Sequence, residues 1–128
     1  MLVIDASAFV DLTLGTATEA MVAQVAADGD WHAPEHLTVE VASAFRGLWR
    51  GGVLDDAAFS AAVVRLTTAR ITGCPVRLLL SRIVELAPNL SAYDAAYVAL
   101  AERLEAPLVT ADRRLASLSS ARCRFITP

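Results

Sequence analysis

Short apolar segments alternate with helix-like segments along the whole chain, and this alternation constrains the fold more than any other feature. Five segments have the length and apolar character of buried strands: residues 1–4, 31–34, 71–76, 107–110 and 124–126. Seven segments have helical character: residues 6–14, 17–27, 36–50, 55–68, 77–86, 92–104 and 112–118. Apolar strands that alternate with helices form parallel sheets covered on both faces. The sequence therefore predicts an α/β fold.

Glycine and proline mark where several of these segments end. Gly15 ends the first helical segment, and the glycine pair at residues 51–52 ends the longest one. Gly73 and Pro75 interrupt the third apolar segment, so we expect a central parallel sheet of four to five short strands. The 128 residues contain no repeat and no linker-like stretch, so we expect one domain over residues 1–128.

The basic residues exclude several kinds of chemistry. All 11 are arginines, and the chain contains no lysine. This excludes a P-loop lysine and Schiff-base catalysis. It also argues against response-regulator receivers and haloacid-dehalogenase-type phosphatases, which use an aspartate beside a lysine. The net charge of −3 disfavours a protein that binds nucleic acid by positive charge alone.

Neither the apolar runs nor the first residues of the chain indicate a membrane protein. The longest unbroken apolar run covers residues 95–101, whereas a membrane span needs roughly 20 residues. The first residues lack the basic and long apolar regions of a signal peptide, so we expect a cytoplasmic protein. Cys74 and Cys123 lack metal-ligand spacing and are expected to be reduced thiols. His32 and His36 lack the pattern of a zinc protease and are expected to be structural or surface residues.

Four acidic residues are expected at one edge of the sheet. Asp5 follows the first strand and Asp112 follows the fourth, while Glu40 and Asp94 lie in the first turns of two helices. In open parallel sheets, ligands bind at the carboxyl ends of the strands. The sequence thus predicts a ligand site where these acids meet.

Helix capping is the alternative explanation for these acids. Asp5 and Asp112 stand where N-caps are common, and Ser91 with Asp94 resembles a capping box. Helical phase argues for more than capping at two positions. Asp94 shares a face with apolar residues of its helix, and Glu40 lies at the edge of an apolar stripe. A carboxylate aimed at a core needs a partner, a proton or a metal ion.

The chemistry of the four acids favours a hard cation. No lysine is present to neutralise them, and carboxylate oxygens are ligands that suit Mg²⁺ or Mn²⁺. Calcium is disfavoured because the chain has no EF-hand-like loop, and zinc because no histidine or cysteine ligands accompany the acids. If the carboxylates repel one another without metal, at least one should have a raised pKa.

Four sequence segments carry a family resemblance. They are VIDASA at residues 3–8, AP with LTVEV at residues 33–41, LSAYDAAYVALA at residues 90–101, and PLVTADRRL at residues 107–115. In this order and spacing, the chain resembles the PIN-domain ribonucleases of the bacterial VapC toxin type. The resemblance covers nearly the whole chain, although residues 55–88 match only in helical character. It implies a three-layer α/β/α PIN-like domain.

The resemblance also implies roles for individual residues. It assigns one or two Mg²⁺ or Mn²⁺ ions to an acidic quartet of Asp5, Glu40, Asp94 and Asp112. Asp5 and Asp94 are then the most direct ligands, and Glu40 and Asp112 act through waters on the metal.

Three further residues are candidates for supporting roles. Ser7 and Thr110 place hydroxyls where the family often has them, to orient a water or a carboxylate. Ordinary capping beside an aspartate is an equally good explanation for both. Arg113, with its neighbour Arg114, is a candidate contact to the RNA backbone.

The implied activity is metal-assisted hydrolysis of RNA phosphodiester bonds by a toxin. The implied partners are the RNA substrate, a cognate VapB-type antitoxin and a second copy of the chain in a homodimer. Residues 17–27 and 36–50 are candidates for the dimer contact.

Three rival functions remain open from the sequence. A metal-dependent DNA nuclease would keep the fold, although such proteins are usually longer and more acidic. A non-catalytic α/β binding module would use the acids only as caps and would tolerate their replacement. A phosphatase-like enzyme would use Asp5 as a nucleophile, but the missing lysine and the presence of Ser7 two residues later disfavour it.

Overall fold

All five predicted strands form, and they lie side by side in one parallel sheet. The computed structural model describes residues 1–128. The strands are β1 (Leu2–Ile4), β2 (Trp31–Pro34), β3 (Ile71–Cys74), β4 (Leu108–Val109) and β5 (Phe125–Ile126). Their order across the sheet is β3-β2-β1-β4-β5, and every neighbouring pair is parallel. This confirms the predicted α/β class.

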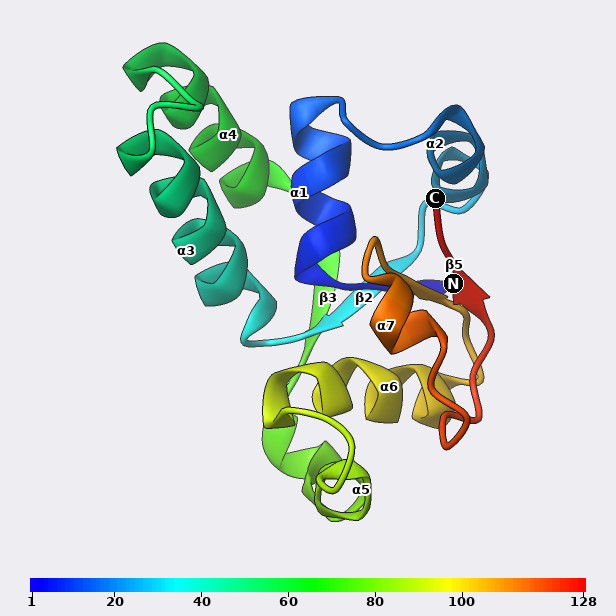
Figure 1. The fold of residues 1–128 in the computed structure, drawn as a ribbon. Helices are drawn as coiled ribbons and strands as arrows, with labels where there is room; N and C mark the ends of the chain where they lie inside the picture. The colour runs from blue at the N-terminus through cyan, green and yellow to red at the C-terminus, as the bar shows by residue number, and fades with distance from the viewer.

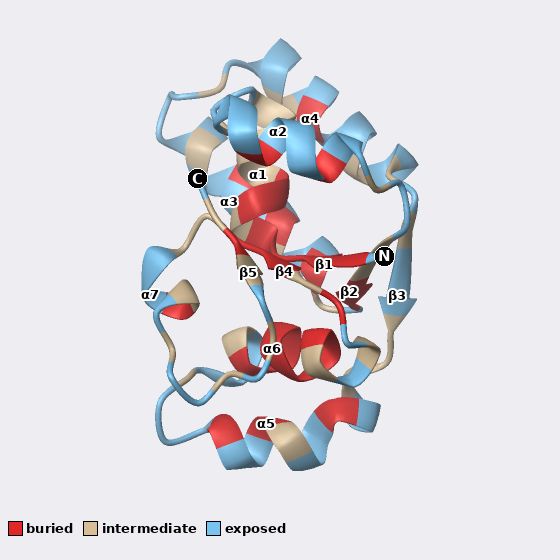
Figure 2. Ribbon diagram, turned by 90° about the vertical axis from the view of Figure 1, so that its right-hand side faces the viewer, coloured by how far each residue is buried: buried red, intermediate tan, exposed pale blue.

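Helices cover both faces of the sheet and complete three layers (Figures 1 and 2). One layer contains α1 (Ala6–Leu14), α2 (Glu19–Ala26), α3 (Leu37–Arg50) and α4 (Asp56–Thr68). The opposite layer contains α5 (Leu80–Leu86) and α6 (Ala92–Leu104), with a 3-10 turn, η1 (Val76–Leu79), before α5. The short helix α7 (Arg113–Ala116) lies beside the sheet edge between the two layers. None of the helices combines the length and hydropathy that a membrane crossing requires.

The chain adds strands first on one side of β1 and then on the other, and this change of side positions the site. The chain runs from β1 out to β3, then crosses over to β4 on the other side of β1. Ile4 pairs with Val109, and the Asp5 amide donates to the Val109 carbonyl at 3.0 Å. The ends of β1 and β4 therefore lie together at the switch point, where open α/β sheets bind their ligands.

The core lies along β1 and α6 (Figure 2). All three residues of β1 are buried, and so are seven consecutive residues of α6, from Ala95 to Ala101. A helix that is buried all round needs apolar neighbours on every side, and α6 finds them between the sheet and α5. Any polar group in the first turns of α6 is thereby held close to the sheet edge.

Helix ends agree with the capping signals in the sequence. Side chains of Asp5, Thr18, Asp55 and Ser91 accept backbone amides at the starts of α1, α2, α4 and α6. Gly15 ends α1 with φ of 73°, a conformation that glycine adopts without steric cost. The segment predicted as a helix over 77–86 begins instead as the 3-10 turn of η1 and becomes α-helical only at Leu80.

Candidate active site

Asp5 is the most deeply buried of the four acids. It is 5% exposed and caps α1, where its Oδ1 accepts the Ala8 amide at 2.8 Å and the Ser7 hydroxyl at 2.7 Å. Burial raises the pKa of Asp5 to about 6, although both hydrogen bonds work in the opposite direction. The charge of Glu40 adds to this rise. A raised pKa was predicted from repulsion between carboxylates, but burial is the larger cause.

Two hydroxyls join the ends of β1 and β4. The Ser7 hydroxyl accepts the Ala111 amide at 3.0 Å and lies 3.4 Å from the Thr110 hydroxyl. Thr110 is fully buried, and its Oγ1 accepts the Asp112 amide at 3.0 Å. Ser7 thus touches the carboxylate after β1 and the backbone after β4, so this network fixes the two strand ends relative to each other.

Glu40 lies on α3, and a buried tyrosine of α6 holds its carboxylate. The Tyr97 hydroxyl donates to Glu40 Oε2 at 2.8 Å, while the Tyr97 ring is 1% exposed. Burial first, and then the Glu40 carboxylate, raise the pKa of Tyr97, so the phenol stays protonated and keeps donating. Tyr97 lies within the motif at residues 90–101, but no hydrogen-bond partner was predicted for it. A buried phenol needs a hydrogen-bond partner, and that requirement was the available signal.

The His36 ring lies against the Glu40 carboxylate, a contact that was not predicted from the sequence. Its Nε2 is 3.6 Å from Glu40 Oε2 and has no hydrogen-bond partner. The ring packs edge-on against Tyr93 and Tyr97, with centroids 5.5 and 4.9 Å apart. Burial lowers the pKa of His36 and outweighs the nearby carboxylates, so the imidazole is neutral at pH 7.

Ser91 caps α6 as predicted, and Asp94 takes part in the cap through the Ser91 hydroxyl rather than through the Ser91 amide of a full capping box. The Asp94 amide donates to the Ser91 hydroxyl at 3.1 Å, and the same hydroxyl donates back to Asp94 Oδ2 at 2.8 Å. The residue is half-buried. Capping therefore accounts for one carboxylate oxygen of Asp5 and one of Asp94, and the other oxygen of each forms no hydrogen bond within the chain.

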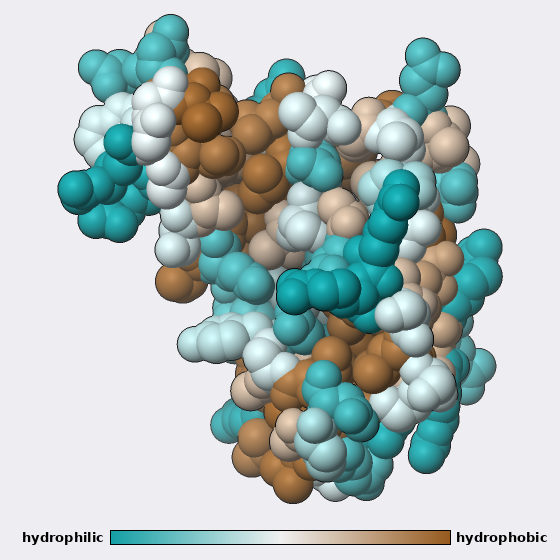
Figure 3. Space-filling view, viewed as in Figure 1, coloured by the Kyte–Doolittle hydropathy of each residue, from teal (hydrophilic) through white to brown (hydrophobic).

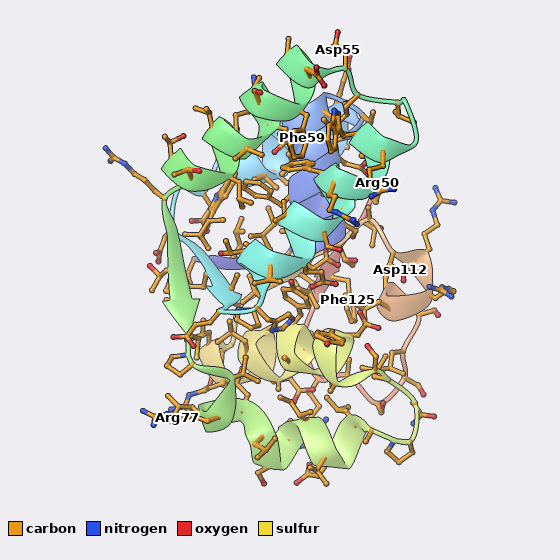
Figure 4. All side chains as sticks on the ribbon, turned by 90° about the vertical axis from the view of Figure 1, so that its left-hand side faces the viewer. Arg50, Asp55, Phe59, Arg77, Asp112 and Phe125 are labelled. Atoms are coloured by element: carbon orange, nitrogen blue, oxygen red, sulfur yellow. The ribbon has the colours of Figure 1, made fainter.

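Asp112 differs from the other acids because a cation already contacts it. It caps α7, and the Arg114 guanidinium donates to its Oδ2 at 3.1 Å. This contact is the main reason why the pKa of Asp112 is lowered. Arg113 is exposed and forms no ion pair. Figure 4, which looks onto this edge of the sheet, shows Asp112 beside α7, and Figure 3 shows hydrophilic side chains gathered over that helix.

The four acids lie along one sheet edge as two pairs. Glu40 lines a cavity of about 360 Å³ with Ser7 and Asp11, next to Asp5. Asp94 and Asp112 line a second cavity of about 280 Å³ with Arg114. No three histidine, cysteine or acidic side chains stand close enough together to hold one ion. Asp11, which hydrogen bonds to Thr16, is a fifth acid at this edge that the sequence analysis did not single out.

The residues at this edge fit a hard divalent cation. Carboxylates and hydroxyls supply only oxygen ligands, which are the ligands that such cations prefer. Asp5 is buried beside Glu40 and forms no ion pair with any arginine or histidine. A buried carboxylate without a positive partner is costly, and a bound cation would remove that cost.

Comparisons with known proteins agree with this fold. The model of the PIN domain family matches residues 2–120. Ribonuclease VapC9 of Mycobacterium tuberculosis is 40% identical over 123 residues, which cover 96% of this chain and 94% of that protein. Two crystal structures share the fold at low sequence identity.

The first structure is PAE2754 of Pyrobaculum aerophilum, with a TM-score of 0.71 and 23% identity over 98% of this chain and 87% of that one. The second is Mycobacterium tuberculosis VapC20, a toxin that cleaves the sarcin-ricin loop, with a TM-score of 0.63 and 20% identity. The aligned region covers 97% of this chain and 99% of the VapC20 chain. On the strength of the family match and the relative at 40% identity, the chain belongs to the PIN domain family and, within it, to the VapC ribonucleases.

Proposed function

We propose that this VapC ribonuclease is the toxin of a toxin–antitoxin pair and cuts RNA with the help of one or two Mg²⁺ or Mn²⁺ ions. Asp5, Glu40, Asp94 and Asp112 would hold the ions. Ribonuclease names among the relatives support the activity, and VapC20 is itself named as a toxin. We propose the cytoplasm as the place of action.

The observation that carries the proposal is the burial of the Asp5 carboxylate without a cation beside it. This carboxylate lies at the switch point of the sheet, beside a second carboxylate. An ordinary helix cap gains nothing from such burial. Asp55 shows this, because it caps α4 through the same bond, with its Oδ1 accepting the Ala58 amide at 2.7 Å, yet stays exposed.

The chain's own residues prepare the site for this cofactor. When bound, the cation supplies Lewis acidity, which activates a water for attack on phosphorus and stabilises charge on the phosphoryl oxygens. Ser7 and the Ala8 amide share Oδ1 of Asp5, so neither occupies Oδ2. Tyr97 orients Glu40 through its hydroxyl, and this fixed geometry lowers the cost of arranging ligands at the moment of binding.

The outer pair of acids faces the side from which RNA would approach. Asp94 and Asp112 are both partly exposed, and the exposed Arg113 stands at the start of α7. Arginine is well suited to phosphate contacts because its guanidinium is planar and always charged. Arg113 would then contact the RNA backbone without holding the cation.

We also propose a VapB-type antitoxin and a second copy of the chain as partners. Exposed apolar side chains on α2 and α3 support a contact between copies, among them Val22 at 46%, Val39 at 73% and Trp49 at 41% exposure. Sedimentation of the purified chain tests the homodimer, and co-purification with the product of an adjacent reading frame tests the antitoxin.

Cleavage of total cellular RNA by the purified protein tests the activity. We expect discrete fragments in Mg²⁺ or Mn²⁺, and none when EDTA removes the metal. Asp5→Asn should abolish cleavage while it keeps the cap of α1. The matched control is Asp55→Asn, which makes the same substitution at the cap of α4, and it should cleave like the wild type.

The rival functions give different results in the same experiment. Single-stranded DNA of the same sequence, cut as fast as the RNA, would indicate a DNA nuclease. A protein that neither cuts RNA nor binds metal by calorimetry would be a binding module whose acids serve as caps. A protein that releases phosphate from a monoester without metal would be the phosphatase-like enzyme.

A further inference from the structure

An exposed aromatic ring lies beside the candidate active site. Tyr93 directly precedes Asp94 at the start of α6, and 64% of it is exposed. With His36, Val39, Glu40 and Ser43 it lines a pocket of about 470 Å³, in the size range of small-molecule sites. The pocket lies between the N-terminal turns of α3 and α6, which face each other across the sheet edge in Figure 4.

The ring of Tyr93 has support on one side and open space on the other. His36 packs edge-on against it at 5.5 Å, with the ring planes 63° apart. His36 in turn packs against the buried Tyr97, at 4.9 Å. Tyr93 is therefore held by a chain of rings that leads into the core, while most of its own surface gains nothing from burial.

Such a ring suits one kind of contact with RNA. Aromatic side chains stack on unpaired bases, and they accept every base because each has a π-face. The pocket includes Glu40, one of the acids proposed to hold the cation that acts on the scissile phosphate. A base stacked here would belong to a nucleotide next to that phosphate.

We propose that Tyr93 forms a base-stacking subsite for an unpaired nucleotide beside the cleaved phosphate, with His36 as the residue that positions its ring. The proposal rests on the proposed ribonuclease function. The subsite discriminates single-stranded RNA from duplex RNA rather than one base from another, because a paired base has no free face to offer.

Steady-state cleavage of a labelled RNA oligonucleotide that spans a mapped cleavage site tests the proposal. Tyr93→Leu removes the π-face, so KM should rise about 5-fold or more, the range expected for losing one stacked base. Its kcat should change less, since Tyr93 does not hold the cation. Tyr93→Phe keeps the ring and should behave like the wild type, and Leu80→Ala, which truncates a side chain of α5 that is 55% exposed, controls for surface changes.

Positioning by His36 has its own readout. His36→Ala should raise KM because the Tyr93 ring loses its support, and His36→Phe should restore KM because it keeps a ring in place. A purely structural role would instead lower the melting temperature and leave KM unchanged.

A second probe measures stacking without cleavage. A single-stranded oligoadenylate with one 2-aminopurine, bound to Asp5→Asn protein, should lose fluorescence when the analogue stacks, and the additional change Tyr93→Leu should prevent that loss. If the wild type cuts RNA but Tyr93→Leu alters neither KM nor this quenching, the subsite is wrong and the ribonuclease stands. If the wild type cuts no RNA, both proposals fall together.

Discussion

Carboxylates stand in opposite electrostatic states in the two halves of the acidic edge. The inner half contains Asp5 and Glu40, and the outer half contains Asp94 and Asp112. Asp5 and Asp112 each cap the helix that follows one of two paired strands, β1 and β4, and both accept a backbone amide at 2.8 Å. Burial raises the pKa of Asp5 to about 6, whereas the contact with Arg114 lowers the pKa of Asp112. The inner half lacks a cation, and the outer half already has one.

A cap pattern in the sequence therefore does not reveal the electrostatic state of its carboxylate. The hydrogen bonds of the two caps are nearly equal, so they cannot cause opposite shifts. The causes lie in burial and in one exposed arginine. The inner half of the edge is therefore where a bound cation would relieve the larger cost.

The largest expected effect is the pH dependence of stability without metal. The folded pKa of Asp5 lies above its unfolded value of 3.8, so its contribution to stability is complete below about pH 3.8 and is lost as pH rises through about 6. The loss amounts to about 3 kcal/mol by pH 7. In EDTA, Asp5→Asn should gain stability relative to the wild type as pH rises over this range.

Urea unfolding of both proteins from pH 3.5 to 7.5 measures that difference. Asp55→Asn, which alters an exposed cap, should show no such trend. If the difference in free energy of unfolding between wild type and Asp5→Asn stays constant with pH, Asp5 is charged at no cost. The two halves would then not differ in electrostatic state.

A bound cation should remove the cost of keeping the buried Asp5 charged in the inner half. At a concentration 100 times its Kd, Mg²⁺ or Mn²⁺ stabilises the folded state by about 2.7 kcal/mol, which raises the melting temperature. Asp94→Asn should remove most of this shift, because it deletes one of the two proposed direct ligands. Differential scanning calorimetry in metal and in EDTA gives both values, and an unchanged shift in Asp94→Asn would assign the cation to the inner pair alone.

Tyr97→Phe tests whether the inner half depends on a fixed Glu40. The substitution keeps the buried ring and removes only the hydroxyl that donates to Glu40. Residues that orient metal ligands typically contribute about 10-fold or more to activity or metal affinity, so we expect cleavage to slow by about that factor. Kinetics with Mg²⁺ titration measure the loss, and recovery at saturating metal would locate the defect in metal affinity.

Much of the scaffold was predictable because local signals determine it. The bounds of α1 and α6 match the predicted segments 6–14 and 92–104, since Asp5, Gly15 and Ser91 mark their ends. The gathering of acids at one sheet edge followed from a general rule about the carboxyl ends of parallel strands. These inferences needed only neighbouring residues or strand order.

What escaped prediction depends on how α3 and α6 pack together. Tyr97 reaches Glu40 across 57 positions of sequence, and His36 meets Tyr93 between the same two helices. No pattern within either helix specifies such a contact. Ala44 shows the same limit, because it follows the buried Leu37 and Val41 at helical spacing and yet is exposed and lines the cavity beside Glu40.

The smallest expected effect concerns the cation of the outer half. Arg114→Ala should let the pKa of Asp112 rise toward its ordinary value, because the guanidinium is the main cause of its lowering. Stability should hardly change, since the arginine side chain is 93% exposed and surface ion pairs contribute little. Carboxylate NMR titration of both proteins measures the shift, and 1 M salt should weaken it in the wild type by screening. Asp112 would then lack a cation, as Asp5 does, while it stays partly exposed. If the pKa of Asp112 in Arg114→Ala still lies below that of Asp5, burial separates the two halves.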